Sequence, residues 1–307
     1  MGLVSLIFAL VLEQWRPLAD RRQLFAPVEG YAGFFERQFN AGEIRHGRIA
    51  WLLAVLPAAA GSWLLYALLL RASPLLALAF NVAVLYLTMG FRQFSHYFTG
   101  IQLALQHDDL PRAQELLAQW RGHPCTDQPR EEVVKLAIEE ALVASHRRVF
   151  AVIFWFVLLP GPSGAVLYRF ADYLGRRWGE SDAAEMSGFG RFAKQAFDAI
   201  EWLPARFTAA SFAVVGDFED AIFCWRAQAA KWPDQALGIV LAAGAGAIGV
   251  RLGNPLAREG VVLDRPELGL GEEADAGFLD STVGLVWRAL VLWLLMLLLL
   301  GIASAVS

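Results

Sequence analysis

The sequence has few of the residues that mark disulfide-rich, metal-binding or nucleic-acid-binding proteins. Its two cysteines, Cys125 and Cys224, lie far apart and outside any CxxC pattern, which excludes a disulfide framework and a zinc site. The five histidines show no paired metal-ligand spacing, so no metal site is expected. Basic residues number 26 and acidic residues 30, so the chain has no broad positive face to neutralise phosphates. A nucleic-acid partner is therefore not expected.

Hydrophobic residues are what the sequence has in excess. They make up 57% of the chain, against about 45–50% in soluble domains. They gather in long blocks, which is typical of membrane proteins. The blocks predict membrane helices at residues 49–70, 75–90 and 283–303, with a shorter run at 2–12 and a glycine- and alanine-rich run at 237–250. We therefore expect an all-α, polytopic integral membrane protein, a helical bundle whose first partner is the lipid bilayer.

Between residues 91 and 148 the chain is polar and has helical periodicity. Asp109 suits the N-cap of a first helix, Pro111 its first turn, and Gly122 its end. Apolar residues at helical spacing predict one buried face on each of two helices. These residues are Ala113, Leu116, Leu117 and Trp120 in the first helix, and Val134, Ala137, Ile138, Ala141 and Leu142 in the second. The segment is predicted to be a helical hairpin.

Basic residues indicate the orientation in the membrane. Segments 13–48 and 91–148 carry six and seven Lys or Arg residues. The link at 71–74, between the apolar runs 49–70 and 75–90, carries only Arg71. Because positively charged loops stay in the cytoplasm, the hairpin is predicted to be cytoplasmic, in a multi-pass protein of the bacterial inner membrane. The predicted parts of the chain are the N-terminal membrane segments at 1–90, the polar hairpin at 91–148, and a region at 149–307 with a broken segment, polar helices, the small-residue run and the last membrane helix.

Residues 160–164 read PGPSG and interrupt an apolar run. Proline cannot donate a helix hydrogen bond, and glycine permits a sharp turn. One interpretation is a re-entrant pair of half-helices, the second of which begins near Ser163 and points free N–H groups inward. Together with Arg169 and Arg206, these groups would form a cytoplasm-facing pocket for an anion, either a phosphate or a carboxylate. The other interpretation is a kinked membrane helix with Arg169 at the far interface.

Three further polar motifs each have a functional and a structural interpretation. Residues 244–249 read GAGAIG, but a dinucleotide site needs this motif between a strand and a helix, and the chain has no βαβ alternation. Asp198 and Glu201 lie three residues apart on a predicted helix, where they form either a solvated face or part of a site. The Tyr168–Arg169 pair either anchors the end of the broken segment or holds an anionic ligand.

Four blocks, in order, resemble the CobD/CbiB family of membrane proteins over nearly the full length of the chain. The blocks are FSHYFTGIQLALQHDDLPRAQELL, IEEALVASHRRVFAVIFWFVLLPGPSGAVLYR, FGRFAKQAFDAIEWLPARFTA and AGAIGVRLGNPLAREG. The second resembles a family block that ends in GxPGAxxYR, and the third resembles one that ends in PARLTA. The glycines of residues 244–249 belong to the last block, which removes the dinucleotide-binding interpretation.

The resemblance implies a function in cobalamin biosynthesis. Members of the family join adenosylcobyric acid to an aminopropanol compound through an amide bond, using ATP. If this activity is retained, ATP and Mg²⁺ are the expected cofactors, and the site needs groups that manage phosphate. The resemblance also makes a corrinoid an expected ligand.

The chain departs from the family pattern at most charged and amide positions. A family Glu-Asn pair is replaced by Val143 and Ala144, and a nearby aspartate by Arg147. The family's Asn-Thr-Leu-Asp-Ser is replaced by residues 172–176, and a late Ser-Pro-Asn by residues 234–236. Scaffold positions respond to packing and site positions to chemistry. Since the scaffold matches and the site does not, the resemblance implies that the amide-forming reaction is lost or changed.

No residue is singled out as catalytic. The ligand-binding candidates either match the family or carry the predicted pocket, and they are Glu139, Ser163, Tyr168, Arg169, Asp198 and Arg206. AmpE, a membrane protein linked to β-lactamase regulation, resembles a divergent member with the same front half. This gives an alternative function, a membrane sensor or regulatory protein that binds an anionic ligand or a partner. A homo-oligomer and a membrane partner protein are both left open.

Overall fold

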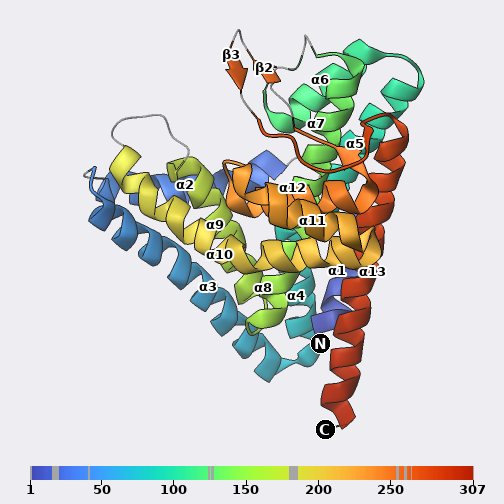
Figure 1. Ribbon diagram of the computed structural model, residues 1–307. Helices are drawn as coiled ribbons and strands as arrows, with labels where there is room; N and C mark the ends of the chain where they lie inside the picture. Colours follow the sequence, from blue (N-terminus) through green and yellow to red (C-terminus); the bar gives the residue numbers. More distant parts are fainter. Residues whose placement is uncertain are drawn as a thin grey trace. The chain divides into compact units, whose positions relative to one another are not determined.

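The chain folds almost entirely into α-helices, as the sequence predicts (Figure 1). The computed structural model describes residues 2–15, 21–40, 42–123, 125, 128–179, 186–253, 256–258, 261–263 and 265–306. Two compact units are formed, the first by Met1–Gly90 with Ala151–Leu203 and the second by Phe91–Phe150 with Pro204–Ser307. The three-part division made from composition stays a prediction.

The first unit contains the N-terminal helices and both arms of the broken segment. Its helices are α1 (Gly2–Trp15), α2 (Arg21–Phe39), α3 (Ile44–Ala72), α4 (Pro74–Thr88), α8 (Ala151–Leu158), α9 (Ser163–Gly179) and the first part of α10 (Met186–Val215). Within this unit α3 packs against α4 and α9, and α1 packs against α4.

The second unit contains the polar hairpin, the rest of α10 and the C-terminal helices. Its helices are α5 (Phe91–Gln106), α6 (Leu110–Arg121), α7 (Arg130–Ser145), a π-helical turn (His146–Phe150), α11 (Phe218–Gln228), a 3₁₀ turn (Ala229–Lys231), α12 (Gln235–Ile248) and α13 (Gly277–Val306). Its short strands pair β1 (Val250–Arg251) with β4 (Glu272–Glu273) in parallel, and β2 (Leu256–Arg258) with β3 (Val261–Leu263) antiparallel.

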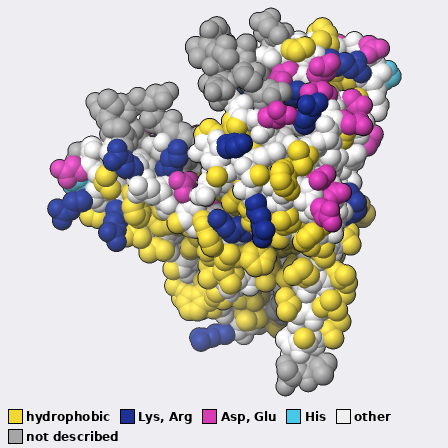
Figure 2. Space-filling model, in the orientation of Figure 1, with side chains coloured by type: hydrophobic (Ala, Val, Ile, Leu, Met, Phe, Trp, Pro, Cys, Tyr) yellow, Lys and Arg dark blue, Asp and Glu magenta, His cyan; other side chains and the backbone are white. Residues whose placement is uncertain are grey.

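Three helical stretches of the described chain are long and apolar enough to cross a membrane: Ile44–Ala72, Arg130–Leu158 and Gly277–Ser304. The first and last confirm the helices predicted at 49–70 and 283–303. Both carry rows of exposed apolar side chains, as expected for helices that face lipid (Figure 2). These residues include Leu53, Leu56, Leu64 and Leu68 on α3, and Val291, Leu295 and Leu299 on α13.

Two predictions about membrane helices need correction. The run at 75–90 forms α4, which has 15 residues. At 1.5 Å per residue it is about 22 Å long, shorter than a hydrocarbon core of about 30 Å. The stretch Arg130–Leu158 was not predicted to be a membrane helix, because its first half is polar. Its most apolar window is 61% buried by protein, against 17% for α3, so protein side chains surround much of it.

The polar hairpin has the helix ends that the sequence predicts. The Asp109 side chain accepts a hydrogen bond from the Arg112 N–H at the start of α6. At its end, Gly122 adopts a left-handed conformation, with φ at 74°. Every predicted face residue of both helices is buried. However, α7 is also buried at positions outside its predicted face, including Lys135 and Glu139, so it is a central helix and not a simple amphipathic one.

The PGPSG segment breaks the helix, as predicted. Helix α8 ends at Leu158, and α9 begins at Ser163 and turns back against α8 (Figure 1). Gly161 has φ at 62°, which favours glycine, and Tyr66 of α3 packs over it. The Ser163 hydroxyl donates to the Pro160 carbonyl at 2.8 Å. The two prolines have no N–H group, so the turn has two fewer backbone donors that need partners.

The close approach of α8 and α9 predicts a large effect at Gly164. A Cβ atom there would lie 1.8 Å from the Trp155 carbonyl oxygen, so Gly164→Ala must push the two helices apart. We expect a loss of about 1–3 kcal/mol in the free energy of unfolding, as for other overpacked sites. Thermal unfolding in detergent measures it. The matched control is Gly61→Ala in α3, where nothing lies within 4 Å of the added atom. Equal effects of the two substitutions would contradict the packing described.

Candidate functional site

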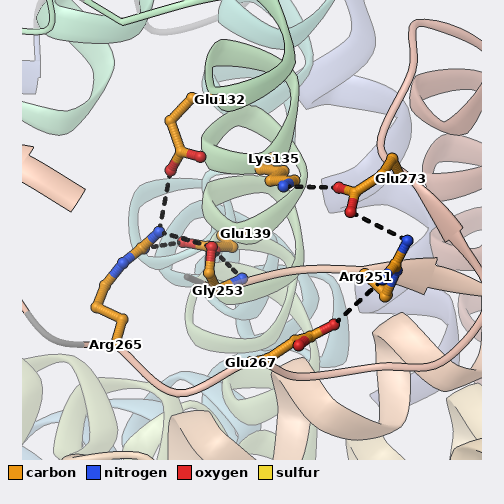
Figure 3. Close-up of polar contacts among 8 residues, drawn as sticks. All are labelled: Glu132, Lys135, Glu139, Arg251, Gly253, Arg265, Glu267 and Glu273. Atoms are coloured by element: carbon orange, nitrogen blue, oxygen red, sulfur yellow. Dashed lines mark hydrogen bonds and ion pairs between the residues drawn. The ribbon is translucent and has the colours of Figure 1, made fainter. Parts of the chain in front are cut away.

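Helix α7 carries three charged side chains on one largely buried face. Glu132, Lys135 and Glu139 are separated by three and four residues, so they lie on one face of the helix. All three point toward the connection that runs from Arg251 to Glu273 (Figure 3). Lys135 and Glu139 are each 6% exposed. Charged side chains buried to this extent need partners, because desolvation of an isolated charge is very costly.

Glu139 binds two segments that are far apart in the sequence. Its Oε1 atom accepts a hydrogen bond from the Gly253 N–H at 3.0 Å, and its Oε2 atom accepts one from Arg265 at 2.6 Å. Arg265 also donates to Glu132 at 3.2 Å (Figure 3). The Arg265 guanidinium lies over the Trp232 ring, 5.7 Å from its centre. Both oxygens of the Glu139 carboxylate are therefore occupied within the chain.

A second branch of the cluster holds strand β4 beside β1. Lys135 donates to Glu273 at 2.8 Å, and Arg251 pairs with the same carboxylate at 3.0 Å. Arg251 also approaches Glu267 at 3.8 Å (Figure 3). The hydrogen bond from Lys135, reinforced by its charge, lowers the pKa of Glu273 from its usual 4.5.

A separate arginine–aspartate pair lies in the second unit. Arg147, in the π-helical turn, donates to the Asp234 Oδ2 atom at 3.2 Å. The other oxygen of Asp234 accepts the N–H groups of Ala236 and Leu237, and so caps α12. Consequently, the Asp234 carboxylate accepts hydrogen bonds both from the N-terminus of α12 and from the Arg147 guanidinium.

The first unit contains the Tyr168–Arg169 pair at the start of α9. The Tyr168 side chain is fully buried, and its hydroxyl donates to Glu201 at 3.5 Å. Arg169 donates to the Asp172 Oδ2 atom at 3.0 Å, and Arg176 donates to the same oxygen. Asp172 and Arg176 therefore form an ion pair within α9.

The predicted site residues do not gather into one cluster. Ser163 is buried in the PGPSG turn, while Tyr168 and Arg169 bind side chains within the first unit. Asp198 is exposed on α10. Arg206 belongs to the second unit, whereas Arg169 belongs to the first, so the pocket predicted from both arginines stays a prediction.

Several charged residues of the clusters were not singled out from the sequence. Arg265 and Glu273 lie in the stretch before the last membrane helix, and both bind α7. The available signal was the spacing of Glu132, Lys135 and Glu139, which places three charged residues on one face of a helix. In the described ranges, no three His, Cys, Asp or Glu side chains gather in a way that could hold a metal ion.

Comparison with known proteins identifies the family. A family model described as CobD/Cbib protein matches residues 6–286, and the chain belongs to the CobD/CbiB family. The cobalamin biosynthesis protein CobD of Stutzerimonas stutzeri is 34% identical over 96% of each chain. The CobD of Chromobacterium violaceum is 34% identical over 91% of this chain and 88% of its own. No solved structure matches this chain. These relatives are named for cobalamin biosynthesis and give no support to the AmpE-like alternative.

The Arg265 cluster predicts a strong effect of one substitution. Arg265→Met leaves the carboxylates of the largely buried Glu132 and Glu139 side chains without their shared cation. Breaking a buried ion pair in this way costs about 3–5 kcal/mol of the free energy of unfolding. The measurement is unfolding of the purified protein in detergent.

Arg251→Met is the matched control for Arg265→Met. The Arg251 side chain is 40% exposed, so its ion pairs should contribute less than about 1 kcal/mol. In addition, Arg265→Met combined with Glu132→Gln and Glu139→Gln should recover stability, since no unpaired charge remains buried. If the triple variant is no more stable than Arg265→Met alone, the cluster is not held by charge pairing.

The lowered pKa of Glu273 predicts a pH-dependent contribution. Because the folded state lowers this pKa, the contribution is present above the unfolded pKa and is lost as pH falls through the folded value. Glu273→Gln should therefore lower the melting temperature above about pH 5, and the difference should vanish in stronger acid. Melting curves between about pH 3 and pH 7 test this. Glu272→Gln, at the neighbouring position on β4, is the matched control for a substitution in this strand.

Proposed function

We propose that this protein acts in cobalamin biosynthesis in the bacterial inner membrane, through a site that has been rebuilt. In this proposal the amide-forming reaction that the family resemblance implies is lost or changed. Membership of the family and two relatives named for cobalamin biosynthesis, each 34% identical, support the pathway. The apolar helices α3 and α13 support the membrane location.

The observation that carries the proposal is the pairing of replaced positions. Arg147 pairs with Asp234, and Asp172 pairs with Arg176. All four are positions at which the chain departs from the family pattern. Each new charge has a new partner of opposite sign, so the replacements neutralise one another. This supports a site that was changed as a unit and kept its fold, in contrast to one that lost residues at random.

The carboxylates of these clusters do not fit a Mg²⁺ site of the kind that ATP chemistry needs. Mg²⁺ requires carboxylate oxygens and several waters in octahedral geometry. Glu139, Asp172 and Asp234 each accept hydrogen bonds from an arginine, and a guanidinium repels a divalent cation. A metal ion would have to displace these partners from buried or half-buried pairs. The contacts therefore support a structural role for these three carboxylates, in which each binds an arginine of the chain.

The remaining parts of the proposal concern orientation and ligand. The basic residues of segment 91–148 support its placement in the cytoplasm. A corrinoid is the proposed ligand, because the relatives are named for cobalamin biosynthesis. Retention of the amide-forming activity is the second candidate function. It is favoured by one observation, the 34% identity that extends over 96% of the chain.

Complementation separates these two candidates. A strain that lacks its cobinamide-forming enzyme is supplied with this chain, and cobalamin-dependent growth is scored. We expect no restored growth, because most charged motif positions are replaced. The CobD of Stutzerimonas stutzeri is the positive control, and an immunoblot of membranes verifies that both proteins are present at similar levels.

A direct assay completes the test. Purified protein in detergent receives Mg²⁺-ATP, adenosylcobyric acid and either aminopropanol or its phosphate. We expect no condensation product under conditions in which the Stutzerimonas relative forms it. Product at a comparable rate, or restored growth, would establish the second candidate and overturn the rebuilt site.

A further inference from the structure

Asp172 has a buried carboxylate that the chain satisfies on one side only. Its side chain is 1% exposed. The Oδ2 atom accepts hydrogen bonds from Arg169 and Arg176. The Oδ1 atom has no hydrogen-bond partner among the residues that the structure describes. A buried carboxylate oxygen without a donor is costly, because it has lost its hydration. A donor from outside the described residues would remove this cost.

Arg169 brings unused donors to the same place. Its side chain is 14% exposed, and a guanidinium carries five N–H donors. Nη1 is the one Arg169 nitrogen with a bonded acceptor in the described part of the chain, and that acceptor is Asp172. An open acceptor on Asp172 thus lies beside open donors on Arg169.

The charges around this place select the kind of group that fits. An anion would meet the free oxygen of Asp172, and an ammonium ion would meet Arg169 and Arg176. A neutral group with one acceptor and one donor side by side satisfies both residues without adding charge. A primary carboxamide is such a group, since its carbonyl oxygen accepts and its NH₂ group donates.

We propose that Arg169 and Asp172 bind a carboxamide group of the ligand, with Arg169 donating to its oxygen and Asp172 accepting from its nitrogen. Corrinoids carry primary carboxamides around the edge of the ring, so this inference rests on the proposed function and specifies a contact for its ligand. Arg176 is 47% exposed and donates to the Oδ2 atom of Asp172, so it leaves the Oδ1 atom for the amide.

Equilibrium dialysis of the full-length protein in detergent, followed by corrinoid absorbance, tests the contact. The probes are cobinamide, whose side chains are carboxamides, and the corresponding corrin with free carboxylates. Wild type should bind cobinamide and discriminate against the carboxylate form. Asp172→Asn and Arg169→Gln should each weaken cobinamide binding by about tenfold or more, because a hydrogen bond to a charged group is lost.

Two further variants keep the result interpretable. Arg176→Ala leaves both amide partners in place, so cobinamide binding should be kept or strengthened. Glu36→Gln removes the Arg177 ion pair elsewhere in the first unit, at 3.1 Å, and should leave binding unchanged. Melting temperatures of all variants verify folding.

Each outcome assigns success or failure to one claim. If wild type binds neither corrin, the proposed function fails and the contact fails with it. If wild type binds cobinamide and Asp172→Asn binds equally well, a buried water satisfies Asp172 and this inference alone is overturned. The same holds if Arg176→Ala loses as much affinity as Asp172→Asn, because the effect would then follow the charge network and not the amide contact.

Discussion

A carboxylate buried in an apolar protein must find a cation or hydrogen-bond donors, because the loss of its hydration costs several kcal/mol. Glu139 meets this requirement with the Gly253 N–H and the Arg265 guanidinium. Gly253 and Arg265 lie 12 residues apart in the sequence, and one carboxylate binds both of them. The same contacts fix the connection between α12 and α13 on the central helix α7. Without them the Lys135–Glu273 pair would still hold this connection, but Glu139 would remain as an uncompensated buried charge.

The same constraint acts on the backbone of the broken segment. At membrane depth an N–H group without a partner cannot turn to water. The turn between α8 and α9 limits this cost with two prolines, which have no N–H, and with the Ser163 hydroxyl bonded to the Pro160 carbonyl. The glycines then allow the two helices and Tyr66 to approach closely. A sharp reversal inside an apolar region is thereby compatible with satisfied backbone groups.

The other arginine–carboxylate pairs of the chain follow the same physics. An isolated replacement of a neutral or acidic residue by arginine would leave a partly buried charge without a partner. Arg147 is tolerated because Asp234 lies beside it, and Arg176 because Asp172 does. In each pair the carboxylate compensates the charge of the arginine, so the helices can pack around it.

The sequence by itself determined the features that depend on neighbouring residues. The all-α class, the ends of α6 at Asp109 and Gly122, the buried faces of the hairpin and the break at PGPSG all follow from short patterns, because helix periodicity, capping and proline chemistry act over a few residues. Patterns of length alone were less secure, since the run at 75–90 forms a helix too short to cross a membrane. Only the tertiary structure decided the ion pairs, in which Glu139 meets Arg265 from 126 positions away and Arg147 meets Asp234 from 87. A charged residue at a position predicted to be buried indicates that a partner is needed. Helix packing determines which residue is the partner, because many residues of opposite charge satisfy the same electrostatic requirement.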